Sequence, residues 1–165
     1  MVTCKTARYI VGWRISRTAH TGFVLDALEQ ALYQRRINLP SRLRRHHPLR
    51  LSRQNGTLSN YAHGPISRGQ LKYTERLAEA GIEPSVGSVG DSYDNALAET
   101  INGLYKAELI RRRAPWKSFE AVEMAMLSWV DWFNNRRLME PIGNIPPAEA
   151  EARYYAMQEA MRMAA

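Results

Sequence analysis

The sequence predicts an α/β domain whose C-terminal part is helical, and three observations carry this prediction. Residues 8–16 are rich in β-branched and aromatic side chains, as strands are, and an amphipathic helical pattern follows them at once. Beyond residue 90, apolar residues recur at helical spacing in successive segments. Between these parts, residues 37–69 keep neither the period of a strand nor that of a helix. We therefore expect a strand and helix over 1–36, an irregular Arg-rich segment over 37–69 and a mainly helical part over 70–165.

The composition is that of a soluble domain with a hydrophobic core. Of 165 residues, 45% are hydrophobic and 24% are charged, which excludes disordered and collagen-like chains. No apolar run approaches the ~18 residues that cross a bilayer, and the first residues lack the apolar stretch of a secretory signal. Cys4 is the only cysteine, so an internal disulfide and a cysteine-based zinc site are excluded. We expect a cytoplasmic protein without a membrane partner.

The N-terminal elements form the beginning of a βα unit. In residues 8–16, the side chains of Ile10, Val11 and Trp13 favour a strand bounded by polar residues. Thr21 then precedes a helix whose apolar positions recur at helical spacing, at Val24, Leu25, Leu28, Ala31 and Leu32.

Proline and glycine interrupt every pattern over residues 37–69. Order returns at 70–81, where the apolar spacing predicts a short helix closed by Gly81. A short strand over 83–89 can follow it.

Three helices are predicted in the rest of the chain. The first runs over 95–112 with Ser92 or Asp94 as its cap, and its narrow apolar stripe consists of Leu97, Ile101, Leu104 and Ala107. The second is the clearest element: behind a capping Ser118, its apolar face consists of Phe119, Val122, Met126, Trp129, Val130 and Phe133. This spacing is typical of a buried helix face, so we interpret the stripe as core and not as a base-stacking platform. The third helix covers 148–161.

The positive charge is concentrated in one segment. A net charge of +7 and a pI near 9.9 favour a nucleic-acid partner. No acidic residue lies between Glu29 and Glu75, whereas this interval contains Arg35, Arg36, Arg42, Arg44, Arg45, Arg50, Arg53, Arg68 and Lys72. Two interpretations stay open: a DNA-binding arm that contacts phosphates, or an accidental or disordered insert.

Glu99 is the candidate for metal-dependent chemistry. Phosphoryl transfer with divalent cations needs several carboxylates, because Mg²⁺ prefers oxygen ligands. Asn102 and Lys106 follow Glu99 at helical spacings that place all three on one face. A carboxylate, an amide and an ammonium in one stripe can follow a nucleic-acid backbone. The alternative is that Glu99 is a surface residue that compensates the helix dipole.

A resemblance to a known family decides between these alternatives. The run Gly-Asp-Ser-Tyr-Asp-Asn-Ala-Leu-Ala-Glu-Thr at 90–100, with Leu-Tyr-Lys-Ala-Glu at 104–108, resembles the end of the catalytic domain of DDE transposases of bacterial insertion sequences. The resemblance continues through Trp-Val-Asp-Trp-Phe-Asn-Asn-Arg-Arg at 129–137 and through 140–149, and it covers 70–156 well. Residues 8–36 look like the second strand and first helix of the same domain.

The resemblance implies an RNase H-like fold, similar to the catalytic core of retroviral integrase. It implies that Glu99 is the last of three acidic ligands of Mg²⁺ or Mn²⁺, and that Lys106 lies where such enzymes touch DNA. Asn102 belongs to the same stripe, and Arg136 and Arg137 either contact phosphates or end a helix in solvent. The implied partners are DNA, as element ends and target, and further copies of the chain or of an intact transposase.

The sequence departs from this family at the other two acids. The first aspartate of the triad belongs to a strand before residues 8–16, and no aspartate at all lies between Asp26 and Asp91, where the second belongs. We therefore expect an incomplete core that lacks the first strand and has a disrupted third strand. A shifted reading frame explains the Arg-rich segment, since residues 47–51 can be encoded so that the next frame gives Thr-His-Ser-Asp.

These departures leave open whether the chain is an enzyme. Our interpretation is a transposase-derived protein for the transposition of an insertion sequence, inactive as the chain stands. The alternative is a non-catalytic DNA-binding regulator that uses the Arg-rich segment.

Overall fold

The computed structural model describes residues 1–4, 6–17, 21–38, 72, 75–76, 78–79 and 92–164. The chain divides into two compact units: the first comprises Met1–Cys4 and Val11–Thr100, and the second comprises Lys5–Ile10 and Ile101–Ala165. Most of the predicted irregular segment, and the strand predicted at 83–89, lie outside the described residues. Within the described ranges, no helix is long and apolar enough to cross a membrane.

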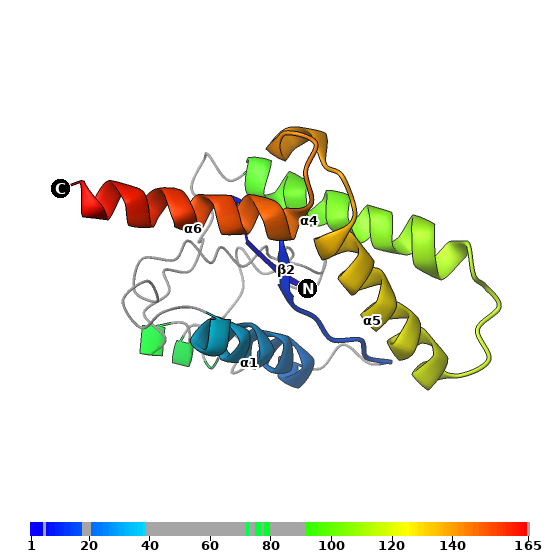
Figure 1. Cartoon of the computed structure of the whole chain (residues 1–165). Coiled ribbons are helices and arrows are strands. Elements are labelled where there is room, and N and C mark those ends of the chain that lie inside the picture. Colours follow the sequence, from blue (N-terminus) through cyan, green and yellow to red (C-terminus); the bar gives the residue numbers. More distant parts are fainter. Residues whose placement is uncertain are drawn as a thin grey trace. The chain divides into compact units, whose positions relative to one another are not determined.

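A small sheet and one helix open the chain. The strands β1 (Val2–Thr3) and β2 (Ile10–Gly12) pair with each other, and helix α1 (Thr21–Asn38) contacts β1 (Figure 1). On α1, Leu28 and Ala31 are completely buried, as the spacing predicts. The helix predicted after residue 21 is confirmed, and it extends into the first residues of the segment expected to be irregular.

The strand predicted over 8–16 is wrong in length, and β1 was not predicted. Arg8 has a φ of 57°, which lies outside the extended region and ends the strand on its N-terminal side. On the other side, the backbone N–H of Trp13 donates to the side-chain oxygen of Gln30 at 2.8 Å, so this donor is taken by α1. The strand is therefore confined to Ile10–Gly12, between these two points.

Gly12 lies where β2 and α1 come closest together. A Cβ atom on Gly12 would lie 2.2 Å from the carbonyl oxygen of Ala27 and 3.1 Å from the Cβ of Ala31. Only a residue without a side chain permits this approach of strand and helix. Small residues on both elements thus bring the two backbones into contact.

Part of the helix predicted over 70–81 is described. Lys72, Glu75, Arg76, Ala78 and Glu79 are helical. Arg76 donates through Nε and a terminal nitrogen to the two carboxylate oxygens of Glu29 on α1. This bidentate ion pair joins the segment to α1.

The helix that carries Glu99 begins earlier than predicted. It runs as α4 (Ser92–Tyr105) and continues as the π-helical segment η2 (Lys106–Arg111). Ser92 and Asp94 both lie within the bounds of α4. Asp91, the residue before α4, lies outside the described residues.

The π-helical segment also corrects the predicted apolar stripe. Leu97 and Ile101 are buried as expected, but Ala107 is exposed and Leu109 is buried in its place. An ideal α-helix brings residue 108 back near the line of Ile101, whereas the wider π turns bring residue 109 there. The buried stripe therefore continues at Leu109, a position that a regular period of 3.6 residues does not predict.

The second unit is built on α5 (Phe119–Asn135), which agrees closely with the sequence pattern. The Ser118 hydroxyl accepts a hydrogen bond from the backbone N–H of Ala121 at 3.1 Å, which confirms the predicted cap. Of the predicted apolar face, Met126, Trp129, Val130 and Phe133 are buried in the core, whereas Phe119 and Val122 are half-buried. The interpretation of this stripe as core is therefore confirmed.

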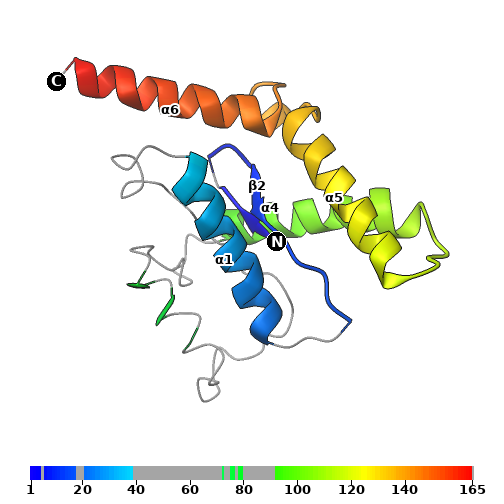
Figure 2. The same ribbon diagram turned by 60° about the horizontal axis from the view of Figure 1, so that its bottom comes forward.

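A short turn joins α5 to the last helix. It contains the 3₁₀ turn η3 (Glu140–Ile142), and Gly143, with a φ of 90°, and Asn144, with a φ of 56°, reverse the chain. Helix α6 (Pro147–Met163) follows, starting one residue before and ending two residues after the predicted range, and it packs on α5. Figures 1 and 2 show α6 running on beyond this junction.

Candidate functional site

The three candidates on the α4–η2 helix are accessible to different degrees. Glu99 is exposed on α4, Asn102 follows one turn later and is half-buried, and Lys106 is exposed as the first residue of η2. Their assignment to metal and DNA stays a prediction.

The described residues do not fit a divalent metal ion. Among them, no three side chains of His, Cys, Asp or Glu lie close enough together to hold one. Other acids are engaged elsewhere: Asp26 lies 3.7 Å from Nε of Arg14, and Asp131 accepts a hydrogen bond from Asn135 at 2.9 Å. A single carboxylate on α4 does not complete the coordination of Mg²⁺.

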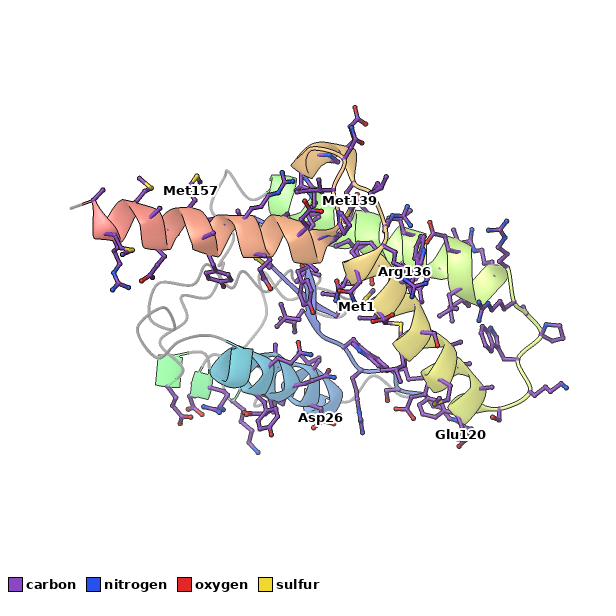
Figure 3. The ribbon with its side chains drawn as sticks, in the orientation of Figure 1. Met1, Asp26, Glu120, Arg136, Met139 and Met157 are labelled. Carbon is purple, nitrogen blue, oxygen red and sulfur yellow. The ribbon has the colours of Figure 1, made fainter. Side chains whose placement is uncertain are left out.

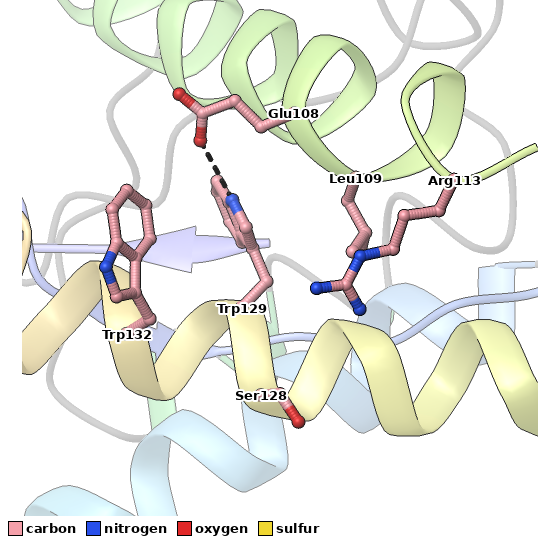
Figure 4. A pocket seen from close by; sticks show the side chains of 6 residues that line it. All are labelled: Glu108, Leu109, Arg113, Ser128, Trp129 and Trp132. Atoms are coloured by element: carbon pink, nitrogen blue, oxygen red, sulfur yellow. Dashed lines mark hydrogen bonds between the residues drawn. The ribbon is translucent and has the colours of Figure 1, made fainter.

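Glu108 is the centre of the polar network in the second unit. Its Oε2 accepts a hydrogen bond from the indole N–H of Trp129 at 3.0 Å (Figure 4). Arg137 donates to Oε1 at 2.6 Å and to Oε2 at 2.8 Å. The charged side chains of Glu108 and Arg137 are 28% and 20% exposed, so this ion pair is partly shielded from solvent. It ties η2 to the C-terminal end of α5.

Sequence reasoning missed Glu108, although a signal was present. An acid near the C-terminal end of a helix is opposed by the helix dipole. Glu108 stands just before three arginines at such an end. An acid in this unfavourable place indicates a specific partner, which the structure supplies as Arg137.

The two arginines predicted to contact DNA differ in their surroundings. Arg136 is exposed at the end of α5, where its backbone N–H donates to the carbonyl of Trp132 (Figure 3). The Arg137 guanidinium is bound to Glu108 and lies 5.3 Å from the ring centre of Trp132 and 5.7 Å from that of Phe133. Of the two, Arg136 is the one whose side chain is open to a ligand.

A pocket lies between η2 and α5. It has a volume of about 340 Å³ and is lined by Glu108, Leu109, Arg113, Ser128, Trp129 and Trp132 (Figure 4). Trp132 is 39% exposed, in contrast to the buried Trp129 three residues before it. Tyr105 packs edge-on against Trp129 with ring centres 5.7 Å apart, and burial raises the pKa of its hydroxyl.

A buried amide also joins distant parts of the chain. The side chain of Asn134 accepts a hydrogen bond from the backbone N–H of Ile10 and donates one to its carbonyl, both at 2.9 Å. Its side chain is buried although it lies in the last turn of α5.

Comparison with known proteins identifies the family. Residues 80–147 match the Integrase core domain family. Over 160 residues, 96% of its length, the chain is 50% identical to a putative transposase for insertion sequence element IS986/IS6110 of Mycobacterium tuberculosis, of which it covers 52%. Over 150 residues, 91% of its length, it is 54% identical to the transposase for insertion sequence element IS629 of Shigella sonnei, of which it covers 44%.

The chain thus spans about half the length of the curated relatives that it matches. No solved structure matches it. The matches nevertheless cover nearly the whole chain at high identity, and they include the helix of Glu99 and both arginines at the end of α5. Residues 80–147 belong to the Integrase core domain family, which has an RNase H-like fold, and the chain is similar over nearly its whole length to part of the DDE-type transposases of bacterial insertion sequences.

Proposed function

We propose that the chain forms part of the catalytic core of an insertion-sequence transposase and acts on DNA at the ends of the element and at its target. The identity of about half of all aligned residues to named transposases carries this proposal. In this proposal, residues 1–36 and 70–165 are parts of the core and residues 37–69 are an irregular insert.

Within this core, Glu99 is the proposed catalytic acid and metal ligand, and Asn102, Lys106, Arg136 and Arg137 are proposed DNA contacts. The exposure of Glu99, Lys106 and Arg136 supports their roles, because DNA reaches only accessible side chains. Arg137 is a proposed contact because it is the neighbour of Arg136 in the sequence. Its guanidinium also forms an ion pair with Glu108.

We further propose that the chain as it stands does not catalyse strand transfer. DDE-type enzymes use Mg²⁺ or Mn²⁺, and such ions need several oxygen ligands. The sequence has no aspartate between Asp26 and Asp91, and the described residues offer no acidic cluster around a metal.

A nicking assay tests both the site and the inactivity. The purified chain is incubated with supercoiled plasmid in Mg²⁺ or Mn²⁺, beside the Glu99→Gln variant. We expect equal, background levels of nicking from both proteins. Nicking by the unmodified chain that is lost in Glu99→Gln would disprove the inactivity and establish Glu99 as catalytic.

DNA binding by the predicted contacts is measured separately. Lys106→Ala and Arg136→Ala are each expected to weaken binding to labelled duplex DNA and to lower its salt dependence by about one phosphate contact. Arg162→Gln on α6 is the matched control, since Arg162 is exposed and lies 3.6 Å from Glu159. If the control lost as much affinity as the two variants, the assignment of these contacts would be wrong.

The second candidate is a non-catalytic regulator that binds DNA through the Arg-rich segment. The absence of any acid between Glu29 and Glu75 favours it. It predicts salt-dependent DNA binding that is lost when Arg42, Arg44 and Arg45 are all changed to alanine. Full binding by this triple variant would exclude the regulator and favour contacts on the core.

A further inference from the structure

Four exposed cations gather where η2 ends. Arg111, Arg112, Arg113 and Lys117, here called the basic turn, are all exposed, and within the described part of the chain none of them has an ion-pair partner. The turn is held in shape by Trp116, whose indole N–H donates to the carbonyl of Ile110 at 3.1 Å. A fixed cluster of uncompensated cations favours a polyanionic ligand.

The pocket between η2 and α5 opens beside this turn. Arg113 belongs to both, because its side chain lines the pocket together with Trp129 and Trp132 (Figure 4). The buried Leu109 contributes an apolar wall. A ligand bound to the basic turn can therefore also contact the indole rings that line the pocket.

The acid in the pocket does not repel an anion. Among the described residues, Glu108 is the only acid that lines it, and Arg137 neutralises its charge through two contacts of 2.6 and 2.8 Å. The Ser128 hydroxyl is also occupied, since it donates to the carbonyl of Met124 at 3.1 Å. The groups left for a ligand are the Arg113 guanidinium and the exposed part of Trp132.

These groups match the two halves of a nucleotide. A flat base stacks on an indole ring, and the phosphates on either side pair with guanidinium groups. A pocket of about 340 Å³ is of a size that accommodates a single nucleotide. In a duplex the bases are stacked on one another and cannot enter such a pocket, so an unpaired nucleotide fits and a paired one does not.

We propose that the pocket and the basic turn bind an unpaired nucleotide of a DNA strand, with its base against Trp132 and its phosphates on Arg111, Arg112 and Arg113. This inference rests on the proposed function, which makes DNA the partner. It adds a surface for single-stranded DNA that is made of residues other than Lys106 and Arg136.

The test compares single-stranded and duplex DNA by fluorescence anisotropy. The full chain is titrated against labelled oligothymidine and against a labelled duplex of equal length at several salt concentrations. Trp132→Ala is expected to weaken single-strand binding by about tenfold with an unchanged salt slope, because it removes an aromatic ring and no charge. Changing Arg111, Arg112 and Arg113 together to glutamine is expected to reduce the salt slope by about 2.

Matched controls separate these effects from unfolding. Tyr33→Ala removes an exposed aromatic ring on α1, and Arg153→Gln removes an exposed arginine on α6; both should bind as the unmodified chain does. Trp132→Phe keeps a stacking ring and should recover part of the lost affinity. Circular dichroism of each variant confirms that its helices are intact.

Unchanged single-strand binding by Trp132→Ala would overturn the inference, and so would a loss equal to that of Tyr33→Ala. Single-strand binding that depends on Lys106 and Arg136 but not on Trp132 would overturn the inference and leave the proposed function standing. Absence of binding to either DNA would overturn both.

Discussion

The two units of the chain differ in how their secondary-structure elements pack: one uses close backbone contact, and the other uses large side chains. In the first, β2 and α1 approach so closely at Gly12 that no side chain fits between them. In the second, η2 and α5 are joined through large polar and aromatic side chains, with Glu108, Arg137 and Trp129 in one network. The first junction is therefore sensitive to added atoms, and the second to removed atoms or charges. Variants at each junction test this contrast.

The largest effect is expected in the core of α5. Phe133 is completely buried and stacks on Trp129 with ring centres 5.1 Å apart. Phe133→Ala should lower the free energy of unfolding by about 3–5 kcal/mol, because it leaves a cavity. Urea denaturation measures the loss, and Leu127→Ala on the exposed face of the same helix should cost far less. Equal losses in the two variants would contradict the assignment of the core face.

At the first junction, an added methyl group should be costly. Gly12→Ala places its Cβ 2.2 Å from the Ala27 carbonyl oxygen, and overpacking of this kind costs about 1–3 kcal/mol. Hydrogen exchange should show faster exchange in peptides of α1. Gly22→Ala is the control: a Cβ on Gly22, in the same helix, meets nothing within 4 Å, so this change should be neutral or stabilising. A stable Gly12→Ala variant would show that strand and helix are not in backbone contact.

Removal of one charge should weaken the second junction. Glu108→Gln loses the ion pair with Arg137 and should cost about 1–2 kcal/mol at low salt, with a smaller difference at high salt. Glu149→Gln removes an exposed ion pair with Arg153 and should lower the free energy of unfolding by only about 0.3–0.5 kcal/mol. If the two losses were alike in urea denaturation, the Glu108 network would be no more than a surface ion pair.

The smallest effect concerns the start of α5. Ser118→Ala removes the acceptor of the Ala121 N–H and should cost about 1 kcal/mol. Ser128→Ala removes only a hydroxyl that donates back to its own helix and should be close to neutral. If Ser128→Ala lowered the melting temperature more than Ser118→Ala, Ser118 would not be the N-cap of α5.

The sequence was most informative where one period governs a long element. The cap at Ser118 and the buried face of α5 follow directly from local pattern, because burial on one side of a regular helix leaves a clear period. The family was identified from motifs around Glu99 and along α5, and the comparisons confirm it.

Other features depend on tertiary contacts that no local pattern contains. The strand β2 is short because Arg8 adopts a positive φ and Gln30 takes the Trp13 N–H. Leu109 replaces Ala107 in the core because the helix widens at η2. The polar roles of Glu108 and Asn134 arise from partners 29 and 124 residues away along the chain.

The Asn134 side chain has a consequence for how the chain meets other proteins. Its carboxamide offers one acceptor and one donor to the backbone of Ile10, as a neighbouring strand would do. An unpaired strand edge invites the addition of a foreign strand, which is a common route to aggregation. Because Asn134 already occupies both backbone groups of Ile10, an incoming strand would have to displace a buried amide before it could pair there. One side chain of a helix thus protects this position of a very short strand against intermolecular β-pairing.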